Sequence, residues 1–356
     1  MSLLFEPVSV RAVQIRNRLW VSPMCMYSAV DGVPQEWHHT HLAQFASGGA
    51  GLIVAEASAV VPEGRISPRD SGLWNDAQRD AWAPIVRAIH DRGAAAGIQL
   101  AHAGRKASTW WPWASERGSV PAAEGGWITT APSAVAFEGF DEPVALDTAG
   151  IERVVAGFAD AARRAVEGGF DVLEVHGAHG YLLHQFLSPL SNLRNDEYGG
   201  SLENRARLLL RVVDAVREAA GPDRAVFVRI SATDHAEGGF SPDEAAVVAD
   251  RAIEHGADLI DVSSGGLVAH QRIEVHPGYQ VPLAAAVRRG GRIPASAVGI
   301  ITSGAQAEAV LQAGDADAIF AAREWLRDPH FALRAAHELG VDVPYWPDQY
   351  LRARWR

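Results

Sequence analysis

Residues 171–181 read DVLEVHGAHGY, a run that is mostly apolar and ends in two histidines and a tyrosine. Its first half has the composition expected where a parallel strand is covered on both faces. Runs of the same kind, such as LIVAE, AVFVRI and DAIFAA, recur along the chain. The pattern predicts eight strands, at Leu19–Ser22, Gly51–Glu56, Ala96–Ala101, Asp171–His176, Ala225–Ile230, Asp258–Ser263, Ala297–Ile301 and Ala318–Ala321.

Amphipathic stretches typical of helices lie between these strands, including Asp76–Asp91, Ile151–Glu167, Leu202–Ala219 and Pro242–Glu254. Glycines follow several of them, at positions where a helix commonly ends: Gly93, Gly168, Gly221 and Gly256. Eight strand–helix units without a linker favour a closed (β/α)8 TIM barrel over an open doubly wound sheet. We therefore expect a single domain over residues 1–356.

Two segments depart from the repeat. Val8–Arg18 alternates in polarity before the first strand, and we expect a hairpin that plugs the bottom of the barrel. His102–Thr148 is a long insertion rich in Trp, Gly and Pro, and loops of this length are often lids or binding loops. It follows the third strand, on the face where barrel active sites lie.

The composition excludes several classes of partner. The chain carries 43 acidic and 32 basic residues, a net charge of −11, which disfavours nucleic acid and anionic membranes. No run is long and apolar enough for a membrane span, and the start, MSLLFEPVSV, lacks a signal-peptide pattern. The single cysteine, Cys25, cannot form an internal disulfide. These features predict a cytoplasmic enzyme.

Active sites of α/β barrels lie at the carboxyl ends of the strands, and the last two ends often bind phosphate. Here these ends carry Ser303-Gly304 and Ala322-Arg323. Glycine lets backbone N–H groups approach an anion and arginine supplies a charged fork, so we favour a phosphate site. The alternative is a tight turn at Gly304 and a surface ion pair at Arg323. Neither a dinucleotide fingerprint nor a P-loop motif is present.

The cluster after the fourth strand, His176, His179 and Tyr181, has three possible interpretations. The histidines could be a satisfied hydrogen-bonding pair or half of a metal site with Glu174, although no complete ligand set is evident. They could instead donate hydrogen bonds to a substrate carbonyl, each worth roughly 2.7–4 kcal/mol in the transition state. Tyr181, with an ordinary pKa of about 10, could then act as a general acid.

Arg229 lies on an apolar strand, where an unpaired guanidinium is very costly. Its partner is either a barrel carboxylate, Glu56 or Glu174, or an anionic ligand, which we favour.

Several runs together resemble the old yellow enzyme family: SPMCMYS, QLAHAGRKA, EVHGAHGYLLHQFLSPLSNLRNDEYGGSLENRARLL, VRIS and GIITSG…ADAIFAAREWLRDP. The resemblance extends from about Phe5 to Arg356. Cys25 and the Arg- and Trp-rich C-terminus are similar to the bacterial thermophilic-like ene-reductase branch.

The resemblance implies an FMN-dependent ene-reductase that takes hydride from NADPH or NADH and reduces enones and enals. FMN would be held by Ser22, Pro23, Met24, Cys25, Ala57, Gln99, Arg229, Ser303, Gly304, Ala322 and Arg323. Substrate would contact Tyr27, His176, Gly177, Ala178 and His179, and Tyr181 would donate the proton. Cys25 would tune the flavin potential and would not act as a nucleophile. The branch also implies a homodimer or homotetramer in which Arg352 or Arg354 reaches a neighbouring site.

Two features depart from the family pattern. Ala322 stands where the family usually has glycine, and residues 109–126 match nothing in the pattern. Two other functions stay open at this point: a metal-dependent barrel lyase or hydrolase using His176 and His179, and a flavin-binding module without turnover.

Overall fold

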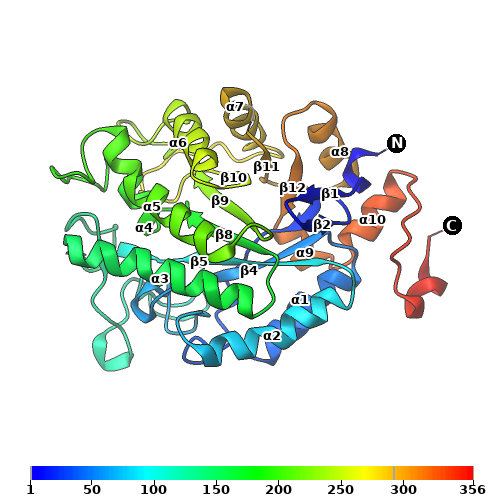
Figure 1. Cartoon of the computed structure of the whole chain (residues 1–356), viewed down its shortest axis with the longest axis horizontal. Helices are drawn as coiled ribbons and strands as arrows, with labels where there is room; N and C mark the ends of the chain where they lie inside the picture. The colour runs from blue at the N-terminus through cyan, green and yellow to red at the C-terminus, as the bar shows by residue number, and fades with distance from the viewer. Residues whose placement is uncertain (1, 292, 356) are drawn as a thin grey trace.

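Eight parallel strands hydrogen-bond in a closed ring in the computed structural model, which describes residues 2–291 and 293–355. Met1, Arg292 and Arg356, which the single-domain prediction includes, lie outside the described residues. The ring confirms the predicted TIM barrel, and helices surround it in Figure 1. Its strands are β3 (Leu19–Val21), β4 (Leu52–Ala59), β5 (Ala95–Ala101), β8 (Val172–Gly177), β9 (Ala225–Ser231), β10 (Leu259–Ser263), β11 (Ala295–Ala297) and β12 (Ala318–Ala321).

The seventh strand departs furthest from its predicted position. We expected Ala297–Ile301, whereas β11 ends at Ala297. Gly299 and Ile300 both have positive φ angles, of 129° and 52°, which extended backbone does not allow. The apolar run VGII is therefore a loop at the mouth of the barrel.

The helices follow the amphipathic pattern. They are α1 (Glu36–Ser47), α2 (Asp76–His90), α3 (Thr148–Glu167), α4 (Leu182–Leu187), α5 (Leu202–Ala220), α6 (Pro242–Glu254), α7 (Val281–Gly291), α8 (Gly304–Gln312), α9 (Arg323–Arg327) and α10 (Phe331–Glu338). Reciprocal side-chain caps fix the starts of α2, through Asn75 and Gln78, and of α6, through Ser241 and Glu244. Gly221, at a φ of 68°, ends α5 as predicted.

The predicted N-terminal hairpin forms from β1 (Val8–Val10) and β2 (Val13–Ile15), which pair antiparallel. Val13 and Ile15 belong to one buried cluster with side chains of the barrel strands, among them Trp20, Phe227 and Phe320. The hairpin turn also contacts the loop just before β9, because the N–H of Ala12 donates to the carbonyl of Asp223. The hairpin thus packs at the amino-terminal end of the barrel, away from the strand ends where function was expected.

The long insertion after β5 contains two short helical turns, η3 (Gly104–Lys106) and η4 (Ala122–Glu124). Its later part forms a small parallel sheet from β6 (Thr130–Ala131) and β7 (Val144–Ala145). At the other end of the molecule, the C-terminal segment runs beside α10 (Figure 1). In the described part of the chain, no helix combines the length and the apolar character that crossing a membrane requires.

Candidate active site at the carboxyl ends of the strands

A layer of buried polar side chains lies inside the barrel between the apolar bottom and the mouth. The strand register places Gln99 beside Glu174 and Arg229 beside Asp261. The Gln99 side-chain amide donates to Glu174 Oε1 at 2.7 Å, and burial raises the pKa of Glu174 to about 8. These contacts fix the orientation of the Gln99 amide, whose oxygen remains available to a donor.

Arg229 has a carboxylate partner, but not either of those we considered from the sequence. Its Nε lies 3.0 Å from Asp261 Oδ2, and both side chains are almost fully buried. The two atoms miss hydrogen-bond alignment, so the contact is an ion pair without a hydrogen bond. Asp261 therefore compensates the charge of Arg229 without forming a hydrogen bond to its Nε. A ligand is not required to explain why this arginine is buried.

His176, His179 and Tyr181 do come together, as predicted. The His176 ring centroid lies 5.2 Å from that of His179 and 5.1 Å from that of Tyr181, with the rings edge to face. His179 holds a positive φ of 58°, and Gly180, which follows it, packs too closely on the Gly266 carbonyl to accept a Cβ. The backbone conformation of the loop that carries the cluster is therefore fixed by close packing.

The protonation states of this cluster follow from burial. Burial, followed by the charge of Arg229, lowers the pKa of both His176 and His179 well below the usual value. Burial also raises the pKa of Tyr181, as do Cys25, Tyr27 and Asp70 nearby. At neutral pH the site thus presents two neutral imidazoles and one protonated phenol, which are hydrogen-bond donors and a potential acid.

The two imidazoles differ in what they contact. His176 Nδ1 is buried without a hydrogen-bond partner among the described residues, whereas His179 Nε2 lies 2.7 Å from Ser263 Oγ. A buried polar atom without a partner usually marks a ligand or an ordered water. Within residues 2–291 and 293–355, no group of three or more potential ligands could hold a metal ion. The geometry thus supports a ligand at His176 and offers no complete ligand set for a metal.

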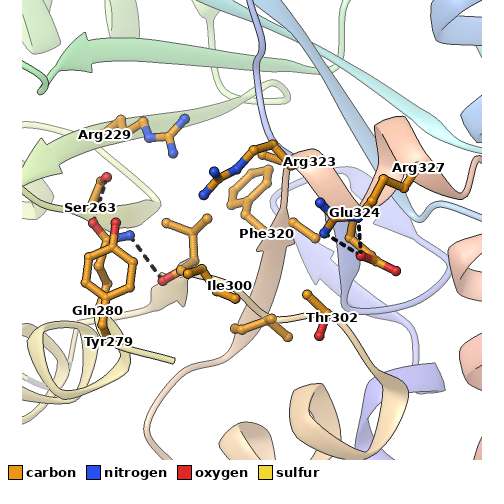
Figure 2. Close-up of a pocket in the computed structure, with 15 residues that line it drawn as sticks. Arg229, Ser263, Tyr279, Gln280, Ile300, Thr302, Phe320, Arg323, Glu324 and Arg327 are labelled. Carbon is orange, nitrogen blue, oxygen red and sulfur yellow. Dashed lines mark hydrogen bonds and ion pairs between the residues drawn. The ribbon is translucent and has the colours of Figure 1, made fainter. Parts of the chain in front are cut away.

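A cavity of about 390 Å³ opens beside this cluster, at the ends of β9 to β12. Arg229 and Arg323 both extend their guanidinium groups into it (Figure 2). The backbone at Gly299 and Ile300 forms another wall. Its volume lies in the range of cofactor-sized pockets, and two cations suit an anionic ligand.

The sequence profile of the NADH:flavin oxidoreductase / NADH oxidase family matches residues 3–342. The chain belongs to this family. It is 48% identical to an NADPH dehydrogenase of Geobacillus sp. (strain WCH70) over 345 residues, 96% of each protein. Among solved structures, morphinone reductase is similar with a TM-score of 0.79 at 29% identity, covering 96% of this chain and 91% of that one. An old yellow enzyme homologue from Zymomonas mobilis is similar with a TM-score of 0.79 at 29% identity, covering 99% and 98%.

This old yellow enzyme family member is an FMN-dependent NAD(P)H oxidoreductase. The cavity residues fit FMN, because Arg229 and Arg323 both line it and two cations suit a phosphate and the electron-rich edge of the flavin ring. At Gly299 a Cβ would lie 3.3 Å from Gln280, so glycine leaves room for close backbone approach. Ala322, which we expect to contact the cofactor, also lines the cavity.

Ser303 and Gly304, which we expected to bind the phosphate, do not line this cavity. Ser303 instead caps α8, where its side chain accepts the N–H of Gln306, and the N–H of Gly304 donates to Glu338 at 2.9 Å. The reason is that β11 ends at Ala297, earlier than we expected. The turn that faces the cavity is therefore formed by Gly299 and Ile300 and not by Ser303 and Gly304. A glycine inside an apparent strand often marks a place where a ligand or another backbone approaches closely. Gly299, inside the predicted strand Ala297–Ile301, is such a signal in the sequence.

The remaining predicted flavin contacts lie around the end of the first strand. Ser22 is buried and its N–H donates to the Ala321 carbonyl, and Cys25 packs against the same apolar cluster as Ala57 and Tyr181. Pro23 and Met24 are half-buried between them. Burial raises the pKa of the Cys25 thiol, and Asp70 and Glu56 raise it further, so the thiol is neutral and a poor nucleophile.

The other predicted substrate contacts also lie at the mouth. Gly177 ends β8 and Ala178, which follows it, is buried, so either could contact a ligand chiefly through its backbone. Tyr27 is half-buried and has a positive φ of 49°, and it is close enough to Tyr181 to raise its pKa.

Proposed function

We propose that this enzyme reduces the activated C=C bond of α,β-unsaturated aldehydes and ketones. The observation that supports this most directly is the buried Nδ1 of His176, which has no hydrogen-bond partner among the described residues and lies beside a protonated Tyr181. One group can hold a carbonyl oxygen while the other supplies a proton on the same substrate. A flavin-binding module without turnover needs neither group.

When bound, FMN would supply the redox chemistry, carrying a hydride equivalent from NADPH to the β-carbon of the alkene. The chain supplies the remaining chemistry. Arg229 would place its positive charge against the bound cofactor, and the buried Asp261 compensates that charge when no cofactor is bound. Gln99, whose side-chain amide donates to Glu174, would present its amide oxygen to an N–H group of the flavin ring.

His176 polarises the substrate carbonyl by donating a hydrogen bond as negative charge develops on the oxygen. His179 adds a second donor once Nε2 exchanges Ser263 Oγ for the substrate oxygen. Because both rings are neutral, they stabilise the oxyanion without protonating it, and each donor is worth roughly 2.7–4 kcal/mol. Tyr181 then breaks its O–H bond and delivers the proton to the α-carbon, and water restores the phenol.

The nicotinamide and the alkene would use the same site above the cofactor, since His176, His179 and Tyr181 converge on one mouth. NADP⁺ must then leave before the alkene binds, and the kinetics would be ping-pong.

The test is NADPH consumption by purified FMN-loaded enzyme with 2-cyclohexenone. We expect rapid turnover by the native enzyme and a loss of at least about a hundredfold in the His176→Ala variant. His255→Ala is the matched control, because His255 is a surface residue that pairs only with Asp214 among the described residues. Turnover that survives His176→Ala would overturn the assigned role, and absence of an FMN spectrum would overturn the cofactor site.

We also propose that the enzyme is a homodimer or homotetramer and that Arg352 is the arginine that reaches a neighbouring site. Arg354 is engaged within its own chain, where it forms a close ion pair with Asp342 and lies over Trp346. Arg352 is exposed and has no such partner among the described residues. Light scattering would give the oligomeric state, and Arg352→Ala should impair substrate binding more than Arg354→Ala does.

A further inference from the structure

The loop at residues 109–120 has a defined attachment over the mouth of the barrel. The N–H of Thr109 donates to the Ile66 carbonyl at 2.8 Å, and the N–H of Val120 donates to the Ser108 carbonyl at 2.6 Å. An isolated antiparallel bridge joins Thr109 and Ser119. The loop therefore stands on a closed stem, so its tip is held in a fixed position beside the strand ends.

A cation–π contact orients the tip. The Arg69 guanidinium lies 3.7 Å from the centroid of the Trp111 ring, well within the range of cation–π contacts. The carbonyl of Arg69 also accepts the N–H of Ala29 at 3.0 Å. Arg69 thus ties the loop to the segment that follows β3, which carries Tyr27.

Trp113 extends from this braced loop onto Tyr27. The two ring centroids are 5.7 Å apart and the rings meet at 88°, so they form a right-angled aromatic corner. Trp113 is 61% exposed although it is one of the largest apolar side chains. An indole that is held against another ring but is mostly uncovered has a flat face on which a ligand can stack.

We propose that Trp113 and Tyr27 form the outer wall of the substrate pocket and select substrates that carry an aryl group beyond the reacting alkene. This rests on the proposed function, in which His176 holds the carbonyl and Tyr27 lies close to Tyr181. An aryl substituent projecting from the pocket would contact the corner edge to face on one ring and stacked on the other. Trp113 is then a specificity-determining residue contributed by the insertion.

Binding to the oxidised FMN-loaded enzyme tests this without turnover. Phenol and 4-phenylphenol share the hydroxyl that His176 can bind, and only the second has an outer ring. The probe is the change in flavin absorbance on titration, and the quantity is the ratio of the two dissociation constants, phenol over 4-phenylphenol. In Trp113→Ala this ratio should fall about 3- to 10-fold, the value of one aromatic contact, and Trp113→Phe should restore most of it.

The matched control is Trp37→Ala, because Trp37 is 55% exposed and its ring stacks on His41 of its own helix α1. It should leave the ratio as in the native enzyme. A ratio that stays constant in Trp113→Ala, or that falls equally in Trp37→Ala, would overturn the proposal.

Turnover measurements distinguish the proposal about Trp113 from the proposed ene-reductase function. The variants are compared with cinnamaldehyde, which carries an aryl group on the β-carbon, and with 2-cyclohexenone, which has none. If the phenol ratio falls as expected and neither alkene is reduced, the wall stands and the ene-reductase function fails. If both alkenes are reduced and the ratio does not change, the function stands and the wall fails.

Discussion

Replacing Tyr181 by phenylalanine removes one oxygen atom and leaves the packing of the ring intact. The ring lies 5.1 Å from His176 and 5.2 Å from Lys106 Nζ, and it packs against the cluster around Ala57 and Ala101. No side-chain hydrogen bond from the Tyr181 hydroxyl is formed among the described residues. We therefore expect the variant to fold, to bind FMN and to accept hydride from NADPH as the native enzyme does.

The change should appear only when the alkene is reduced. A positioned general acid contributes about 10²- to 10⁴-fold, which corresponds to about 3–5 kcal/mol of the barrier. Because burial raises the pKa of Tyr181 above its usual value, the native phenol should also remain a proton donor beyond pH 9. Anaerobic stopped-flow absorbance measures the two half-reactions separately, first with NADPH and then with 2-cyclohexenone.

We expect the rate of flavin reduction to stay within a few-fold and the rate of reoxidation by the enone to fall by at least a hundredfold. Equal losses in both half-reactions would mean that the substitution disturbs the site generally. Unchanged reoxidation would show that the proton comes from another group, and the assignment of Tyr181 would be wrong.

Three other perturbations test the surroundings of the site. Arg323→Ala should raise the dissociation constant of FMN about a hundredfold, measured by fluorescence titration, whereas Arg327→Ala, whose charge is already paired with Glu324, should raise it much less. Cys25→Ser should shift the flavin potential, measured by dye-coupled titration, and retain activity; complete inactivation would contradict a role in tuning. Burial raises the pKa of Asp70 to about 7 from 3.8, so its contribution to stability is lost as the pH rises between these values. Relative to Asp70→Asn, the native enzyme should lose about 2–3 kcal/mol of unfolding free energy in urea between pH 5 and pH 8, and a constant difference would refute the shift.

The periodicity of the sequence predicts most of the fold because the barrel repeats one strand–helix unit. The exception, β11, shows what periodicity cannot detect. Val298–Ile301 has the apolar composition of a buried strand, but the positive φ of Gly299 and Ile300 makes it a loop. An apolar composition indicates that residues are buried, and these residues are largely buried. It does not indicate their backbone angles, which depend on tertiary contacts.

In the candidate site, the sequence predicts clusters of neighbouring residues but not contacts between distant segments. The His176, His179 and Tyr181 cluster is local in sequence, so the sequence predicts it. The partner of Arg229 is Asp261, one strand away, and the alternation of the two strands indicates that both face inward without giving their distance. The contact between His179 and Ser263 likewise depends on how a loop packs across the barrel mouth.

The most direct test of the central claim is the fate of isotopes in a single turnover. FMN-loaded enzyme is reduced with NADPH that carries deuterium at the transferable position, mixed with 2-cyclohexenone, and the product is examined by NMR. We predict cyclohexanone with deuterium on the β-carbon, and in D₂O with unlabelled NADPH, deuterium on the α-carbon. Deuterium on the carbonyl carbon of an alcohol product, or no label in the product at all, would contradict the account.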